Sequence, residues 1–188
     1  MRIDKPIGIY LLLWPTYWAL FLAAQGMPDI KLLIIFTLGV IIMRSAGCVI
    51  NDYADREFDK HVARTKSRPI ASGEISPAKA LILFSILLML AFFLVLLTNK
   101  QTIQWAFIAC LVAIIYPFSK RYINIPQFIL GIAFAMSTIM AFSAQQVYTN
   151  NVYWIFTASI IWALIYDSIY AMADKKEDLK IGIKSSAI

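Results

Sequence analysis

A dense group of carboxylates lies at residues 51–59, which read Asn-Asp-Tyr-Ala-Asp-Arg-Glu-Phe-Asp. Asn51, Asp55 and Asp59 follow one another at intervals of four residues. On a continuous helix these three side chains lie within roughly 80° of arc, and Asp52 widens the arc to about 100°. Because like charges on one helix face repel each other, the group needs a compensating ligand.

A second acidic group lies near the end of the chain, where Asp167, Asp174 and Asp178 surround Tyr170. On one helix the three carboxylates fall within roughly 40° of arc. Asp167 then lies inside an apolar segment, where a carboxylate is costly and usually functional. Oxygen ligands without nearby His or Cys suit a hard cation such as Mg²⁺, which also takes phosphate oxygens. The two groups therefore predict a site where Mg²⁺ holds a diphosphate between opposed carboxylate faces.

Cationic residues accompany the acidic groups. Arg64, Lys66 and Arg68 alternate after the first group, and Lys120 with Arg121 follows an apolar segment. A diphosphate that departs as a leaving group needs cations as well as metal. Each of these residues is equally typical of a simple anchor beside a membrane, so the sequence leaves both roles open.

The elements that must position these groups are apolar blocks. Hydrophobic residues make up 61% of the 188-residue chain and charged residues 15%, whereas soluble domains are about half apolar and a quarter charged. Each block is long enough, or nearly so, to cross a hydrocarbon core of ~30 Å. The blocks are 7–24, 32–50, 80–98, 102–118, 123–142 and 152–173. They predict a single-domain, all-α integral membrane protein, a bundle of about six transmembrane helices.

The basic residues predict the orientation of this bundle. One side carries Arg2, Lys5, Arg56, Lys60, Arg64, Lys66, Arg68, Lys79, Lys120, Arg121, Lys175, Lys176, Lys180 and Lys184, and the other only Lys31 and Lys100. The positive-inside rule then places the N-terminus and both acidic groups in the cytoplasm. The formal charge of +6 belongs to this bias, so no nucleic-acid partner is expected. Arg44, within the second block, is expected to snorkel to the same face or to pair with an aspartate.

Some chemistries are excluded by residue type. Cys48 and Cys110 both fall inside apolar blocks, so they form neither a disulfide framework nor a zinc site. His61 is the only histidine in the sequence. A histidine-based metal cluster, or a Ser-His-Asp triad elsewhere in the chain, is therefore excluded.

At the acidic groups the sequence resembles the UbiA superfamily of membrane prenyltransferases. The first matches the motif N-D-x-x-D-x-x-x-D at Asn51, Asp52, Asp55 and Asp59, and the second matches the Asp-rich motif around Asp174. Shorter segments resemble the branch that acts on 4-hydroxybenzoate in ubiquinone biosynthesis. These segments are 4–8, 13–16, 44–48, 68–69, 116–118 and 180–185.

The resemblance implies a role for each side chain of the two motifs and for several residues near them. It implies Mg²⁺ ligands at Asn51, Asp52, Asp55, Asp59, Asp167, Asp174 and Asp178, of which Asp55, Asp59, Asp174 and Asp178 are catalytic. It implies diphosphate binding by Arg2, Asn51, Arg64, Arg68, Tyr116, Lys120, Arg121 and Tyr170. The implied substrates are a polyprenyl diphosphate and 4-hydroxybenzoate, joined ortho to the hydroxyl in the lipid bilayer of the cell (inner) membrane.

The resemblance also implies about nine helices around a central cavity, whereas this sequence stops after the second motif. We therefore expect an incomplete cavity wall, lower stability and little transfer by this chain alone. Other interpretations remain open: a different aromatic acceptor, an inactive remnant, or an ion transporter that uses intramembrane acids. A CDP-alcohol phosphotransferase also uses acidic groups, but its Asp-Gly-x-x-Ala-Arg pattern is absent.

Overall fold

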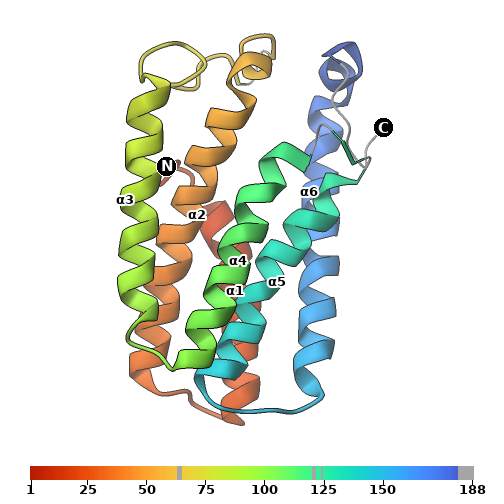
Figure 1. Ribbon diagram of the computed structural model, residues 1–188. Coiled ribbons are helices and arrows are strands. Elements are labelled where there is room, and N and C mark those ends of the chain that lie inside the picture. Colours follow the sequence, from red (N-terminus) through yellow and green to blue (C-terminus); the bar gives the residue numbers. More distant parts are fainter. Residues whose placement is uncertain (63–64, 120–121, 124, 182–188) are drawn as a thin grey trace.

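Six helices make up the part of the chain that the structure describes, and the prediction of an all-helical bundle is confirmed. The computed structural model describes residues 1–62, 65–119, 122–123 and 125–181, with side chains described as far as Met172. The helices are α1 (Ile7–Ala24), α2 (Ile30–Asp59), α3 (Pro77–Val95), α4 (Lys100–Ser119), α5 (Pro126–Ala144) and α6 (Asn151–Ile181). They stand side by side along one common direction (Figure 1).

Prolines and caps set several of the helix ends. α5 begins at Pro126, three residues later than the predicted block, because a proline suits the first turn and keeps the preceding residue out of helical geometry. α3 begins earlier than predicted, where Ser76 caps it by accepting a hydrogen bond from the Lys79 N–H. α2 runs without a break to Asp59. The first acidic group therefore lies on a helix, as its spacing predicts.

The alternating direction of the helices gathers the polar residues at one end. Figure 1 shows the carboxyl ends of α2, α4 and α6 at the upper end of the bundle, while the connections α1–α2, α3–α4 and α5–α6 lie at the lower end. Both acidic groups are at or near the carboxyl ends of their helices. The topology thus brings together segments that are more than a hundred residues apart in sequence.

Helix α5 is the centre of the packing. It packs against α1, α4 and α6, while α2 packs against α1 and α3. Ala19, Leu20, Phe36 and Phe142 form part of a buried cluster that joins α1, α2 and α5. At Gly131 the backbones of α5 and α6 approach so closely that a Cβ would lie 3.0 Å from the carbonyl oxygen of Ile160. Small residues at helix contacts are typical of packing in lipid, where van der Waals contact drives association.

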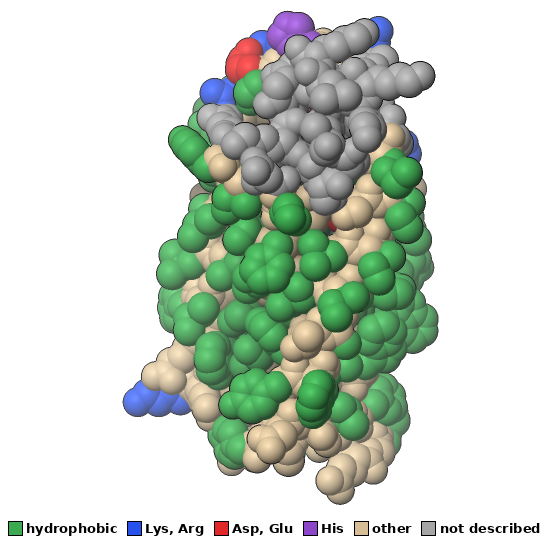
Figure 2. All heavy atoms as spheres, turned by 90° about the vertical axis from the view of Figure 1, so that its right-hand side faces the viewer, with side chains coloured by type: hydrophobic (Ala, Val, Ile, Leu, Met, Phe, Trp, Pro, Cys, Tyr) green, Lys and Arg blue, Asp and Glu red, His purple; other side chains and the backbone are tan. Residues whose placement is uncertain are grey.

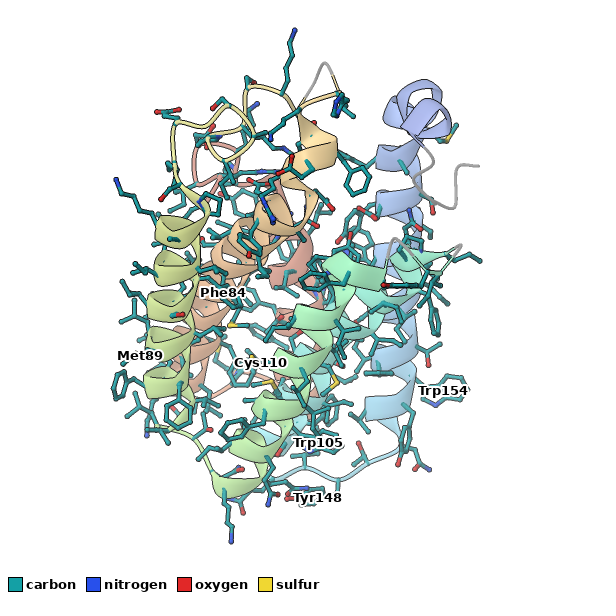
Figure 3. The ribbon with its side chains drawn as sticks, turned by 45° about the horizontal axis from the view of Figure 1, so that its top comes forward. Phe84, Met89, Trp105, Cys110, Tyr148 and Trp154 are labelled. Carbon is teal, nitrogen blue, oxygen red and sulfur yellow. The ribbon has the colours of Figure 1, made fainter. Side chains whose placement is uncertain are left out.

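The outer surface of the bundle is apolar. Figure 2 shows hydrophobic side chains covering the middle of one face, with the coloured charged groups near its two ends. Figure 3 shows Trp154 pointing away from α6, and this side chain is 73% exposed. All six helices are long and apolar enough to cross a membrane. Such a surface is unsuited to water and suits hydrocarbon.

A proline inside α1 leaves a backbone group for another helix to satisfy. Pro15 has no N–H, so the carbonyl of Leu11 loses its intrahelical donor. The indole Nε1–H of Trp162 on α6 donates to that carbonyl at 3.0 Å. Trp162 also makes an edge-to-face contact with Trp18. In lipid a backbone carbonyl without a partner is costly, so this hydrogen bond ties α6 to α1.

We expect Trp162→Phe to lower the free energy of unfolding by about 1 kcal/mol, because it removes the donor to Leu11 while keeping most of the aromatic contact. Unfolding of the purified protein in mixed micelles measures this change. Trp154→Phe, on the same helix, is the matched control and should have little effect. Equal stability of the two variants would contradict the proposed tie between α1 and α6.

Candidate functional site

A cavity of about 760 Å³ runs along the interior of the bundle. Its wall near the carboxyl ends of α2, α4 and α6 is polar. That wall includes Arg2, Lys5, Asn51, Asp55, Asp59, Arg68, Tyr116, Asp167 and Tyr170. Toward the opposite end the wall is apolar, with Leu88, Phe92 and Val95 from α3 and Ala106 and Phe107 from α4. The cavity therefore suits a molecule with a charged head and an apolar tail.

Apart from Asp52, the structure brings the described members of the two acidic groups to one cavity. Asn51, Asp55 and Asp59 project from one face of α2, and Asp167 with Tyr170 lines the wall from α6. Tyr116 joins them from the end of α4 and Arg2 from the N-terminal segment, where the resemblance implies diphosphate contacts.

Some predicted site residues fall outside this description. Arg64, Lys120 and Arg121 lie outside the described residues. Asp174 and Asp178 lie on the last turns of α6, where side chains are not described.

Two arginines neutralise part of the first acidic group. Arg68 Nη1 lies 2.7 Å from Asp59 Oδ2 and 3.2 Å from Asp52 Oδ1. Arg2 Nη2 pairs with the same oxygen of Asp52. The Asp52 side chain is not part of the cavity wall, although its neighbour Asn51 is. The structure thus separates Asp52 from the other predicted metal ligands of α2.

Arg44 lines the cavity that Asn51 and Asp55 also line, but its contacts differ from the expected aspartate pair. Its Nε donates to the carbonyl of Gly8 at 3.2 Å, and its Nη1 lies 3.0 Å from Cys48 Sγ. Within the described residues these partners are a carbonyl and a thiol, and neither is an aspartate. A Cβ at Gly8 would lie 2.6–2.9 Å from the guanidinium, so a larger residue there would displace Arg44 from this position. All three residues line the cavity.

The donor set fits a hard cation that a substrate helps to bind. Within the described part of the chain, no three His, Cys, Asp or Glu side chains gather closely enough to hold an ion alone. The carboxylates of Asp55 and Asp167 and the amide of Asn51 face the same cavity from two helices. Mg²⁺ typically takes one or two carboxylates and completes its shell with water and phosphate oxygens. Such an ion would suit these residues once a diphosphate lies between them.

Two further cations line the cavity wall. Arg44, expected to lie on the same face as the acidic group or to pair with an aspartate, lines the same cavity as Asn51 and Asp55, as a charged residue within an apolar helix usually faces a bundle interior. Lys5 lies next to Arg2 at the polar end, although its position near the N-terminus suggested only an anchor.

Fold and site together define a membrane protein whose apolar cavity is lined by charged residues at one end. A model of the UbiA prenyltransferase family matches residues 12–188. The chain belongs to the UbiA prenyltransferase family.

Curated relatives carry the name 4-hydroxybenzoate octaprenyltransferase. One, from Vesicomyosocius okutanii subsp. Calyptogena okutanii (strain HA), is 66% identical over 189 residues, which cover all of this chain and 69% of that protein. Others, from Saccharophagus degradans and Pseudomonas aeruginosa, are 55% and 56% identical and are covered to 63% and 64% of their length. The chain thus spans about two thirds of the length of these relatives.

Solved structures share the fold. A UbiA homologue from Aeropyrum pernix K1 superposes with a TM-score of 0.82 at 24% identity, over 98% of this chain and 69% of that one. A UbiA homologue from Archaeoglobus fulgidus, bound to GPP and Mg²⁺, superposes with a TM-score of 0.71 at 19% identity, over 95% and 67% of the two chains. At these identities the likeness concerns the fold.

Removal of Arg68 should be far more damaging to stability than removal of its neighbour Arg56. Arg68→Ala leaves Asp52 and Asp59 without a shared counter-ion, and breaking a buried pair from one side costs about 3 kcal/mol or more. Arg56 contacts the exposed carboxylate of Glu57 and the ring of Tyr53. Arg56→Ala should therefore cost about 1 kcal/mol or less.

Both variants are compared by unfolding of the ligand-free protein, so that loss of substrate binding does not enter the measurement. If Arg68→Ala is as stable as Arg56→Ala, then the buried ion pairs of Arg68 do not stabilise the polar end.

Proposed function

We propose that this protein transfers a polyprenyl group from a polyprenyl diphosphate to the ring of 4-hydroxybenzoate, ortho to the hydroxyl. The observation that carries the proposal is the division of one cavity into an acidic and basic end and a long apolar wall. The names of the curated relatives support the aromatic acceptor and the polyprenyl donor. Motif members that line this cavity, such as Asp55 and Asp167, support a diphosphate as the head group.

The residues at the polar end would receive the diphosphate. Asn51, Asp55 and Asp167 would hold Mg²⁺, together with Asp59 and with Asp174 and Asp178 on the last turns of α6. When bound, this ion withdraws electron density from the diphosphate and favours its departure. The guanidinium groups of Arg2 and Arg68 face the same space and would stabilise the developing negative charge. Arg64, Tyr116, Lys120, Arg121 and Tyr170 are proposed to assist them.

The bond changes of the proposed reaction balance without a further reactant. The allylic C–O bond breaks with both electrons leaving on the diphosphate, and the ring carbon ortho to the hydroxyl forms a bond to the allylic carbon. The ring proton passes to the released diphosphate or to a carboxylate. The apolar wall contributes by excluding water, which would otherwise capture the allylic cation.

Arg44 is proposed to bind the carboxylate of the aromatic acid. It lies deeper in the bundle than Asn51, and the Gly8 carbonyl and Cys48 thiol fix its guanidinium at the cavity wall. Arginine pairs with a carboxylate through paired N–H groups, and such pairs strengthen where water is excluded. The acceptor's acid group would then be held apart from the diphosphate, which is also anionic.

The polar end is proposed to lie at the cytoplasmic face of the inner membrane. The distribution of Lys and Arg supports this orientation. We expect a cysteine in place of Lys66 and one in place of Gln145 to be labelled from opposite sides of the membrane. Labelling of both from the same side would contradict the orientation and the count of six spans.

The proposed activity is tested with membranes that contain this chain, 4-hydroxybenzoate, a series of polyprenyl diphosphates and Mg²⁺. Because the relatives are longer, a chimera that continues into the remaining part of the Vesicomyosocius relative is assayed in parallel. In whichever form is active, Asp55→Asn should lower the rate at least about a hundredfold at saturating Mg²⁺, since the charge holds the ion. Ser72→Ala, at an exposed site outside the cavity, is the control. A near-normal rate for Asp55→Asn would overturn the role of the acidic groups.

Arg44→Gln should raise KM for 4-hydroxybenzoate about tenfold or more while leaving KM for the polyprenyl diphosphate nearly unchanged. The reason is that a hydrogen-bonded charge is lost only at the acceptor's acid group. Steady-state kinetics with each substrate varied in turn separates the two constants. Parallel changes in both KM values would instead indicate that Arg44 maintains the cavity as a whole.

A further inference from the structure

Asp52 differs from the other carboxylates of its motif in where its side chain lies. Asn51, Asp55 and Asp59 line the cavity, whereas Asp52 is not part of its wall. It is nevertheless buried, with 8% of the residue exposed. A helix turns about 100° per residue, so Asp52 lies to one side of the face that Asn51 and Asp55 share. A ligand in the cavity would therefore meet Asp55 directly, whereas Asp52 is turned away from it.

Asp52 is one of the two inner members of a row of four alternating charges, in the order Arg2, Asp52, Arg68 and Asp59. Arg2 pairs with Asp52 Oδ1, Arg68 lies 3.2 Å from the same oxygen, and Arg68 continues to Asp59 at 2.7 Å. The side chains of Asp52, Arg68 and Asp59 are 11%, 14% and 9% exposed. The two positive and two negative charges balance, which is the condition for keeping such groups away from water.

This row of ion pairs joins two irregular segments to a packed helix. Arg2 belongs to the segment before α1 and has a backbone φ of 55°. Arg68 belongs to the connection between α2 and α3. Both segments contribute to the polar end of the cavity, through Met1, Arg2 and Lys5 on one side and Val62, Thr65 and Arg68 on the other. Asp52 lies on α2, between them, and contacts both arginines.

Resting on the function proposed above, we propose that Asp52 is a positioning residue, which holds the Arg2 and Arg68 guanidinium groups toward the diphosphate and does not ligate metal. One oxygen of Asp52 restrains both arginines, so that their remaining N–H groups are available at the cavity wall. A metal ion at Asp52 would have to displace both arginines from a site outside that wall. The identical charge of Asp52 and Asp55 therefore serves two different purposes on one helix.

The test compares Asp52→Asn with Asp55→Asn in the full 188-residue chain. A non-hydrolysable prenyl thiodiphosphate serves as the probe, and its binding is measured by calorimetry across a series of Mg²⁺ concentrations. Hydrogen exchange of residues 1–6 and 65–72 is measured on the same samples without ligand. Neither readout requires turnover.

For Asp52→Asn we expect affinity for the probe to fall about tenfold, because two charge-assisted contacts lose their alignment. The Mg²⁺ concentration that gives half-maximal binding should stay unchanged, and exchange of both segments should become faster. Asp55→Asn should show the opposite pattern, with a higher Mg²⁺ requirement and unchanged exchange. If Asp52→Asn raises the Mg²⁺ requirement as Asp55→Asn does, and leaves exchange unchanged, then Asp52 is a metal ligand and the proposal is wrong.

Arg2→Gln keeps the test decisive if Asp52→Asn does not fold. Arg2→Gln breaks the ion pair with Asp52 at its partly exposed arginine. It should speed hydrogen exchange of residues 1–6 and lower the affinity for the probe, without changing the Mg²⁺ requirement. Unchanged exchange and affinity in this variant would overturn the positioning role. If the unsubstituted chain and the chimera bind no probe, the proposed function fails, whereas the exchange data still decide whether Asp52 tethers the two segments.

Discussion

Charge neutralisation inside an apolar bundle is the constraint on which the polar end of this protein depends. Carboxylates on adjacent turns of α2 repel each other, and burial in a low-dielectric setting increases that cost. Arg68 lies between Asp52 and Asp59, and Arg2 completes the balance from the N-terminal segment. These arginines allow α2 to stay helical through the acidic motif.

Away from the polar end, polar backbone groups also find partners on neighbouring elements. Two irregularities of the helices receive a donor from a neighbouring element. The carbonyl left by Pro15 receives Trp162, and Asn99, before α4, donates to the carbonyl of Ser143 on α5 at 2.7 Å. In hydrocarbon such contacts replace the water that would satisfy these groups in a soluble protein. They set the relative placement of α1, α4, α5 and α6, and so the shape of the cavity wall.

Much of this arrangement could be predicted from the sequence, because hydropathy and charge bias act over whole segments. The six blocks and the shared end of the two acidic motifs followed from length and topology. The partner of each charged side chain did not, because it depends on which face of a helix meets which neighbour. Helix geometry alone put Asp52 on the same broad face as Asp55, yet the cavity lies beside Asp55 and the arginines lie beside Asp52. The partner of Arg44 was not predicted for a similar reason, since it is the backbone carbonyl of Gly8.

The apolar wall of the cavity affects how a hydrocarbon tail partitions between the lipid and the protein interior. A hydrocarbon tail gains little by moving from lipid to a wall of Leu, Phe and Val side chains, because the two environments are equally apolar. For a substrate of the proposed reaction, residence in the cavity would then depend on the head group, and each added isoprene unit would change the equilibrium only slightly. The proposed reaction breaks the bond between the tail and the diphosphate, so the head group would no longer anchor the tail. The anion would then pass to water and the lengthened aromatic acid to the bilayer, so solubility would set the direction of release.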